Sequence, residues 1–315
     1  MARRRKNRLL QRIEYAAYRA VARPLRSASD QAVLRWGSRL GNAARVVLRR
    51  RDRLAMRNLR MAFPEKSDAE RRGIIDACWR HFGRETLEGI RMQHLAAEEI
   101  AARCPLVNAE LLDQGLARGR GVLVISAHYG GWEVGGLAAM TRLRNVRTVA
   151  RPLDNEFLER DLARIRERTG AAVVDRRRAA RTLYRGLSDN GVVILLPDQA
   201  VQPREGVLVP FLGLPAWTTD APAKMALRLG STIVFAFCIP DGLGHRLEFE
   251  EPIQIDQLSN GEKDATALTA RINEVISRRI AAHPELWLWM HDRWKGTTPG
   301  EGTTSPGEGT TSDDQ

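Results

Sequence analysis

The fold is decided by residues 121–136, which read GVLVISAHYGGWEVGG. Residues 122–125 form an apolar run of the length expected for a buried strand, and the glycine pair at 130 and 131 indicates a tight turn. The apolar segment from 134 to 140 then predicts a helix. His128 is therefore expected just past the carboxyl end of a strand, which is the edge where open α/β sheets bind ligands.

His128 and Glu133 are the candidate catalytic residues. On one regular helix, residues five apart point about 140° away from each other, but a turn between them lets the Glu133 carboxylate fold back onto the imidazole. A carboxylate on one ring nitrogen fixes the tautomer and leaves the other nitrogen free to take a proton. Such a pair is suited to general-base catalysis on a hydroxyl. The alternative is that His128 only caps the helix while Glu133 favours its N-terminus.

Composition places the chain among globular proteins with a full core. It has 315 residues, a net charge of +12 and 43% hydrophobic residues. No apolar run approaches the length of about 18 residues that a membrane-spanning helix needs. The three cysteines are scattered and include no Cys-x-x-Cys pair, which favours a reducing compartment and argues against a zinc knuckle.

Basic residues are concentrated at the N-terminus. Residues 1–60 contain 18 Lys or Arg against three acids, which is a net charge of +15, so the remaining residues together carry about −3. Such a segment favours a polyanionic partner: nucleic acid, anionic lipid or an acidic carrier protein. No recognised DNA- or RNA-binding motif follows it, so we expect no nucleic-acid partner.

The same segment also has apolar residues at helical spacing, with arginines on the other faces. These include Leu10, Ile13, Ala17 and Val21, and then Val33, Leu34, Leu40 and Val47. Pro24 and the serines at 27 and 29 predict a break into two helices. Basic amphipathic helices are suited to a membrane surface that contains anionic lipids. The alternative is a solvated basic face packed on the rest of the domain.

Downstream, short apolar runs alternate with amphipathic segments. We expect strands at 122–125, 146–150, 172–174, 192–196, 233–239 and 246–249, and helices at 111–117, 155–169, 178–188, 221–230 and 264–283. This alternation predicts an α/β fold with a mixed sheet flanked by helices. We expect a basic helical membrane-associating region over 1–105, an α/β catalytic domain over 106–295, and a disordered tail over 296–315, which has no apolar content.

The hexapeptide His128-Tyr-Gly-Gly-Trp-Glu133 resembles a motif of the lipid A biosynthesis acyltransferases, the lauroyl and myristoyl transferases. That family is part of the glycerolipid acyltransferase superfamily, whose signature is His-x4-Asp or His-x4-Glu. The usual family form is close to His-Phe-Gly-Asn-Trp-Glu, so Gly131 departs from the expected Asn. Further blocks that resemble the family are Asn58-Leu59, Ala62-Phe63-Pro64, His81-Phe82-Gly83, Asp198-Gln199, residues 209–213, 216–222 and 284–295.

The resemblance extends from about residue 8 to 295 and implies a glycerolipid acyltransferase-like fold. It also implies acyl transfer from an acyl carrier protein or acyl-CoA to a hydroxyl of a lipid A precursor, at the cytoplasmic face of the inner membrane. His128 would be the base and Glu133 its positioning partner, with no cofactor or metal. The runner-up acceptors are another glycolipid, such as a phosphatidylinositol mannoside, or a lysophospholipid. Outside this class, the alternative is a basic peripheral membrane-binding protein.

Further site residues follow from the same resemblance. Arg151 matches an Arg-Pro turn near the family's active site, where it would bind a substrate phosphate or the developing oxyanion; the alternative is an arginine that caps a loop. Backbone donors near Gly130 and Gly131 would complete the oxyanion site, so both glycines and Trp132 are expected to contact substrate. The remaining candidates are Asp198 and Gln199, which we expect to order loops at the edge of the site, and Arg293, which we expect to bind substrate.

Several clusters have two interpretations each. Phe211, Leu212 and Leu214 line either an acyl-chain groove or the core. The tryptophans at 287, 289 and 294 form either a membrane-interface belt or a lid on the core. The basic cluster at 175–178 either contacts lipid phosphates or begins a solvated helix. His81 and Glu85 are four apart and look like half of a metal site, but no third ligand follows at suitable spacing, which favours packing.

Overall fold

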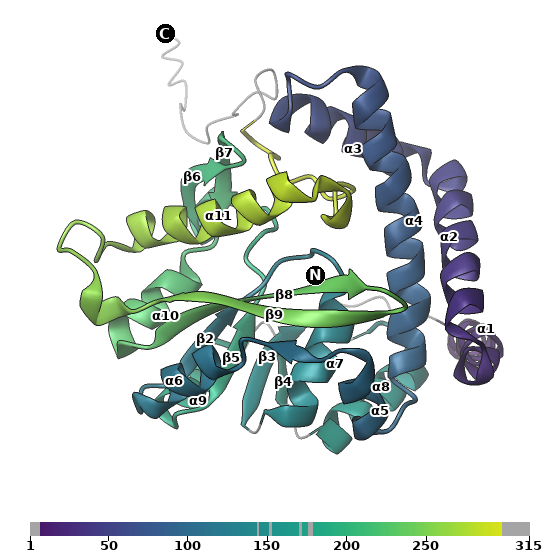
Figure 1. Cartoon of the computed structure of the whole chain (residues 1–315), viewed down its shortest axis with the longest axis horizontal. Helices are drawn as coiled ribbons and strands as arrows, with labels where there is room; N and C mark the ends of the chain where they lie inside the picture. The colour runs from purple at the N-terminus through teal and green to yellow at the C-terminus, as the bar shows by residue number, and fades with distance from the viewer. Residues whose placement is uncertain (1–6, 144, 151–152, 170–171, 176–178, 298–315) are drawn as a thin grey trace, which may run out of the picture.

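A seven-stranded sheet forms the centre of the computed structural model, which describes residues 7–143, 145–150, 153–169, 172–175 and 179–297 (Figure 1). Its strand order is β1-β9-β8-β2-β5-β3-β4. The strands are β1 Leu106–Val107, β2 Val122–Ile125, β3 Val146–Ala150, β4 Ala172–Asp175, β5 Val192–Leu195, β8 Thr232–Asp241 and β9 Gly244–Ile253. All pairs are parallel except β8 with β9. The predicted mixed α/β sheet is thereby confirmed.

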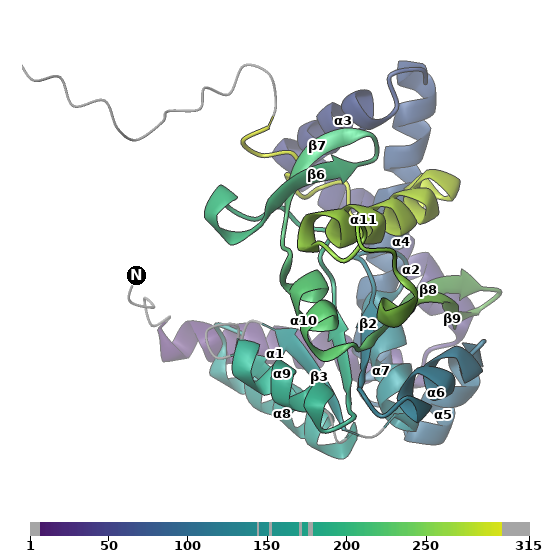
Figure 2. The same cartoon turned by 90° about the vertical axis from the view of Figure 1, so that its left-hand side faces the viewer.

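Helices cover both faces of this sheet (Figure 2). They are α1 Arg8–Ser27, α2 Asp30–Val47, α3 Arg49–Ala62, α4 Asp68–Met92, α5 Ala97–Arg103, α6 Glu110–Ala117, α7 Trp132–Arg142, α8 Glu156–Thr169, α9 Ala179–Ser188, α10 Ala221–Leu229 and α11 Ala265–Ala282. Val122 and Val124 pack toward α5, α6 and α7, whereas Leu123 and Ile125 pack toward α9, α10 and α11. All four side chains of β2 are buried, as expected for a parallel strand that is covered on both faces.

A two-stranded ribbon, β6 Val207–Phe211 with β7 Leu214–Thr218, lies outside the main sheet. The sequence predicts that Phe211, Leu212 and Leu214 lie in a loop, and each strand of the ribbon contains a proline. In the structure Pro210 stands opposite Pro215, and an isolated ribbon tolerates proline because each strand has a free edge. Phe211 is fully buried against the core. Of the two alternatives for this residue, an acyl-chain groove or the core, the structure supports the core.

The two N-terminal helices meet at Ala28 and Ser29, and the Ser29 side chain accepts from the Ala32 N–H at the start of α2. The break is as predicted, but Pro24 is not part of it, because it lies inside the last turns of α1. A proline there removes only one hydrogen bond near a helix end. Within the described residues, no helix is long and apolar enough to span a bilayer.

Helix α2 crosses α4 at very short range because glycines lie at the contact. A Cβ atom at Gly41 would lie 2.0 Å from the Trp79 carbonyl oxygen, and one at Gly83 would lie 2.1 Å from the Gly37 carbonyl oxygen. These glycines therefore allow the backbones to touch, and α2 is fixed along one side of α4 (Figure 1).

The segment after α11 returns to the core. Trp287, Trp289 and Trp294 are each at most 1% exposed, and the Trp287 and Trp289 rings meet edge to face at 4.7 Å. These tryptophans close the core, and the membrane-belt interpretation is wrong. The expected disorder of the tail falls on residues 298–315, which lie outside the described residues, and the proposed domain boundaries stay a prediction.

Candidate active site

His128 lies in a turn between β2 and α7 that is joined to the C-terminal segment. Its carbonyl accepts from the Leu288 N–H at 3.0 Å, and the Gly130 N–H donates to the Leu286 carbonyl at 2.8 Å. The His128 side chain is 23% exposed, so one side of the imidazole is open. These two hydrogen bonds therefore fix the backbone of the turn to the C-terminal segment, while part of the His128 ring stays accessible.

Asp198 is the carboxylate that holds the imidazole. Its Oδ1 lies 2.9 Å from His128 Nδ1, and its Oδ2 accepts from the His128 backbone N–H at 2.9 Å. The Trp287 indole N–H also donates to Oδ2 at 2.9 Å. With the ring proton on Nδ1, facing the carboxylate, His128 Nε2 carries the lone pair and accepts from the Gln199 amide at 3.2 Å. Asp198 and Gln199 thus lie at the centre of the site rather than at its edge.

Glu133 occupies the first turn of α7 as expected, but it does not bond to the imidazole. Its carboxylate accepts from the Trp132 indole N–H at 3.2 Å, and its side chain is exposed. The prediction that the Glu133 carboxylate binds one ring nitrogen of His128 is wrong, because Asp198 occupies Nδ1 and Glu133 bonds to Trp132 instead.

The pairing of β2 with β5 is the feature from which the contact between His128 and Asp198 could have been predicted. Strands β2 and β5 are parallel neighbours in which Ile125 pairs with Leu195. His128 and Asp198 each follow three residues after those paired strand ends, so equal lengths of chain bring them together. A search for polar residues at matching offsets past neighbouring parallel strands would have found this pair.

The electrostatics of the site favour the state in which His128 is protonated and Asp198 is ionised. Burial lowers the pKa of His128, but the charge and hydrogen bond of Asp198, with the charge of Glu133, outweigh burial and raise the pKa above its ordinary value. Burial raises the pKa of Asp198, but the charge of His128 and the bonds from His128 and Trp287 outweigh burial and lower it. The two shifts agree: the imidazolium–carboxylate form is stabilised, as a general base requires.

The N–H groups of Gly130 and Gly131 themselves are paired within the protein and are not the oxyanion donors that were expected near these glycines. Gly130 donates to the Leu286 carbonyl, and Gly131 donates to the Cys238 carbonyl at 2.9 Å. Gly130 has φ +58°, and a Cβ there would lie 1.9 Å from the Cys238 oxygen. The glycine at 130 therefore serves a left-handed turn with no room for a side chain.

The first turn of α7 offers other donors. Among the described residues, no acceptor bonds to the backbone N–H groups of Trp132, Glu133 or Val134. Unpaired N–H groups at a helix N-terminus point along the axis toward negative charge. The Trp132 ring lies 5.4 Å from the His128 ring, which places this helix end next to the imidazole.

Arg293 does not contact an open site. It is fully buried, donates to the Trp217 carbonyl at 2.8 Å and to the Thr218 hydroxyl, and lies 4.4 Å over the Phe211 ring. Burial lowers the pKa of this guanidinium to about 10. Arg293 ties β6 and β7 to the C-terminal segment, and its predicted role in substrate binding is wrong. Arg151 lies outside the described residues, as do residues 176–178.

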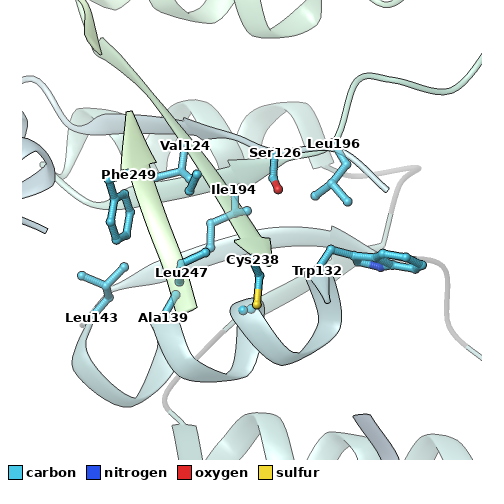
Figure 3. Close-up of a pocket in the computed structure, with 13 residues that line it drawn as sticks. Val124, Ser126, Trp132, Ala139, Leu143, Ile194, Leu196, Cys238, Leu247 and Phe249 are labelled. Carbon is cyan, nitrogen blue, oxygen red and sulfur yellow. The ribbon is translucent and has the colours of Figure 1, made fainter. Parts of the chain in front are cut away.

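An apolar cavity of about 40 Å³ lies between α7 and the sheet (Figure 3). Trp132, Ser126 and Leu196 lie at one end of it, and Leu143, Ala139 and Phe249 at the other. The first end adjoins the turn that carries His128. A volume of about 40 Å³ holds about three water molecules, at 10–15 Å³ each, or a few methylene groups.

The fold and the site are suited to an enzyme that activates a hydroxyl beside an apolar cavity, and comparison with known proteins gives the class, an acyltransferase. The chain belongs to the bacterial lipid A biosynthesis acyltransferase family, whose model matches residues 1–296. This match confirms the resemblance that the sequence motifs indicated. Because the family and the curated relatives are acyltransferases, the protein is an enzyme. The described residues contain no group of three or more His, Cys, Asp or Glu side chains placed to hold a metal ion.

Curated relatives span most of the chain. It is 27% identical over 271 residues to the lipid A biosynthesis lauroyltransferase of Escherichia coli K12, covering 85% of this chain and 87% of the relative. It is 26% identical over 270 residues to the palmitoleoyltransferase of the same strain, covering 85% and 86%. It is 29% identical over 227 residues to a phosphatidylinositol mannoside acyltransferase of Mycobacterium tuberculosis, covering 70% of each.

Proposed function

We propose that this enzyme transfers a fatty acyl chain from the thioester of an acyl carrier protein or acyl-CoA to a hydroxyl of a lipid A precursor. The observation that carries the proposal is the His128–Asp198 pair, with Nδ1 bound by a buried carboxylate, Nε2 facing the Gln199 amide, and a side chain that is 23% exposed. This is the geometry of a general base with its positioning partner. The names of the relatives support the acceptor class.

The reaction begins when the acceptor hydroxyl takes the place of the Gln199 amide at His128 Nε2. The hydroxyl oxygen attacks the thioester carbonyl carbon as its proton passes to Nε2, and Asp198 stabilises the resulting imidazolium. The tetrahedral intermediate then breaks its carbon–sulfur bond, and the imidazolium returns the proton to the departing thiolate. The products are an ester and a free thiol, and His128 is again neutral.

The α7 N-terminus supplies the oxyanion donors in this proposal. Among the described residues its N–H groups at 132–134 have no acceptor, the Trp132 ring lies 5.4 Å from the His128 ring, and the helix dipole favours negative charge at this end. Each well-aimed donor contributes about 3–4 kcal/mol to the transition state. Glu133 then acts by its charge on His128, because it contributes to the raised pKa of that ring.

The cavity beside α7 receives the start of the acyl chain. Its lining is apolar apart from Ser126 and Cys238, and one end adjoins the catalytic turn. A chain seated there presents its thioester carbonyl between His128 and the α7 N-terminus. This assignment replaces the predicted groove at Phe211, Leu212 and Leu214, because Phe211 is fully buried in the core.

The enzyme works at an anionic membrane surface in this proposal. Helix α1 buries Gln11, which is 3% exposed and bonds to α8, together with Ala22 and Leu25. A second set of apolar residues faces outward. Leu9, Leu10, Ile13 and Val21 are 64%, 47%, 57% and 44% exposed. An outward apolar stripe flanked by arginines matches an interfacial helix on anionic lipid.

Lipid mass spectrometry tests the substrate. Lipid A and phospholipids are compared between cells with and without the gene, with complementation by wild type or by His128→Ala. The proposal expects an acyl-chain difference on lipid A that wild type restores and His128→Ala does not. The identity to a phosphatidylinositol mannoside enzyme supports a second acceptor, and an acyl change confined to another glycolipid would favour it. No change in any lipid would overturn the proposal.

A further inference from the structure

Three titratable side chains are buried together behind the catalytic turn. His81 and Glu85 come from α4, and His245 comes from the start of β9, where the β8–β9 pair reaches α4 (Figure 1). Their side chains are 7%, 10% and 6% exposed. Both Glu85 oxygens lie within 3.0 Å of His245 Nε2, whereas His81 Nδ1 is 3.7 Å from Glu85. The acyl-transfer steps above use none of the three.

The Glu85–His245 pair fills the space beside residue 131. A Cβ atom at Gly131 would lie 2.5 Å from Glu85 Oε2, 2.9 Å from His245 Cδ2 and 3.1 Å from His245 Nε2. Gly131 has φ −91°, so its backbone conformation does not demand glycine. Glycine is required here by the pair alone, in the place where an asparagine is usual in the resembling motif.

The pair contacts the turn at Gly131, three residues after His128. Gly131 is fixed on β8 through the Cys238 carbonyl, and Gly130 on the C-terminal segment through the Leu286 carbonyl. His128 lies three residues before Gly131, and the α7 N–H groups begin directly after it. A displacement of the backbone at residue 131 therefore moves both His128 and the N–H groups at the start of α7.

The charges favour an ion pair. Burial lowers the pKa of His245, but the hydrogen bond and charge of Glu85, together with Cys104 and Glu88, outweigh burial and raise the pKa. Burial lowers the pKa of His81, and Glu85 and the Gly130 carbonyl only partly oppose it. The positive charge is thus better stabilised on His245 than on His81. A buried ion pair of this kind fixes geometry more than it adds stability.

We propose that Glu85 and His245 are positioning residues for His128, forming a buried pair that supports the Gly130–Gly131 turn in place of a side chain at position 131. The proposal rests on the proposed role of His128 in acyl transfer. It predicts that position 131 and position 85 are coupled: an asparagine at 131 needs the space that the Glu85 carboxylate occupies.

A double-mutant cycle tests the coupling, with kcat and KM for acyl transfer measured in Gly131→Asn, Glu85→Ala and the double variant. Gly131→Asn is expected to lower kcat at least tenfold with KM for the donor within about twofold of wild type. The double variant is expected to be several-fold more active than Gly131→Asn alone. Gly73→Asn is the matched control, because no atom lies within 4 Å of a Cβ at this site on α4.

Glu85→Gln covers the case in which Glu85→Ala does not fold. It keeps the shape and a hydrogen bond but removes the charge, and is expected to lower kcat severalfold while the melting temperature stays near that of wild type. Full kcat in Gly131→Asn or in Glu85→Gln, or a double variant no more active than Gly131→Asn, would overturn the inference. His128→Ala separates the two proposals: if it retains transfer, the proposed mechanism fails, whatever the cycle shows.

Discussion

Three hydrogen-bond donors surround the Asp198 carboxylate. It accepts from the His128 ring, the His128 backbone and the Trp287 indole, and it is only 1% exposed. Because the same carboxylate holds both the backbone and the ring of His128, it sets the position of the residue as well as the tautomer. Trp287 in turn fixes the carboxylate, so a core tryptophan takes part in orienting the base.

Asp198→Asn removes this charge while keeping the shape. We expect kcat to fall about a thousandfold or more, by analogy with the loss of the aspartate from a catalytic triad. Asp198 raises the pKa of His128, and the base acts in its neutral form. Without Asp198 that pKa falls, so the acid limb of the pH–rate profile moves to lower pH.

Glu133→Gln is the comparison variant for that profile. Its charge also raises the pKa of His128, but as the last of the contributions, and it makes no bond to the ring. The acid limb should move in the same direction by less, with a smaller loss of maximal rate. A larger loss in Glu133→Gln than in Asp198→Asn would show that the positioning carboxylate has been assigned to the wrong residue.

At this scale the sequence identified His128 and its place after a strand, because an apolar run followed by small residues is visible in one dimension. It did not identify the partner of His128, because Asp198 is 70 residues away and only the pairing of β2 with β5 brings it near. The buried position of Arg293 was missed, and the two interpretations of Trp287 stayed open, for the same reason: exposure depends on which elements cover a residue.

Helix α1 is the element whose surface the rest of the chain does not explain. Gln11 and Asn155 join its inner face to the start of α8, and the apolar stripe is left outside. The periodicity was visible in the sequence, but its direction was not, because the buried face of α1 mixes the polar Gln11 with the apolar Ala22 and Leu25.

Ile13→Asp tests the outward stripe of α1. Ile13 is 57% exposed, so the fold should tolerate the change, whereas a carboxylate in the lipid interface is unfavourable and repels anionic headgroups. Sedimentation with vesicles of anionic phospholipid is expected to show several-fold weaker binding. Leu243→Asp is the matched control, since Leu243 is 50% exposed but lies between β8 and β9. Equal binding by both variants and wild type would remove α1 from the membrane interface.

The α2–α4 contact gives an element-scale stability prediction. In Gly41→Ala the new methyl would meet the Trp79 carbonyl, which is backbone and cannot rotate away, so the helices must separate. We expect a loss of about 1–3 kcal/mol in the free energy of unfolding. Gly73→Ala on the same α4, where the methyl meets nothing within 4 Å, should instead stabilise by about 0.5–1 kcal/mol. Urea unfolding of both variants measures the difference, and equal signs would contradict the close packing.

In the whole molecule, Asp30 connects the N-terminal helices to the catalytic part. At the start of α2, its carboxylate accepts from Arg91 of α4 at 2.7 Å and lies 2.8 Å from Arg103 of α5. Burial raises the pKa of Asp30, but the bonds and charges of Arg103 and Arg91 outweigh it and lower the pKa. The network therefore joins three helices through a group that is charged at neutral pH.

Acid titration of stability tests this connection. Because the folded pKa of Asp30 is depressed, its contribution is present above the ordinary aspartate pKa of about 3.9 and is lost as the pH falls through the lower folded value. The melting temperature of Asp30→Asn should be below that of wild type at pH 7, and the gap should narrow as the pH falls below about 4. A gap that is constant with pH would contradict the assignment.

The architecture was predictable where apolar runs are long and separated by turn residues. Strands β2, β3, β5 and β8 fall where such runs predicted them. The β6–β7 ribbon was missed because its prolines argue against a strand, and β1, only two residues long, is too short to leave a periodic signal. Sheet order also came only from the structure, since pairing partners are not encoded in local periodicity.

The most direct test of the central claim is transfer of a labelled acyl group by the purified enzyme. Wild type and His128→Ala are compared on an acyl-carrier-protein thioester and a lipid A precursor in anionic vesicles, with vesicle binding measured in parallel. The account predicts acylated product with wild type and a loss of at least about a thousandfold with His128→Ala, at unchanged vesicle binding. Transfer by His128→Ala at the wild-type rate would contradict it.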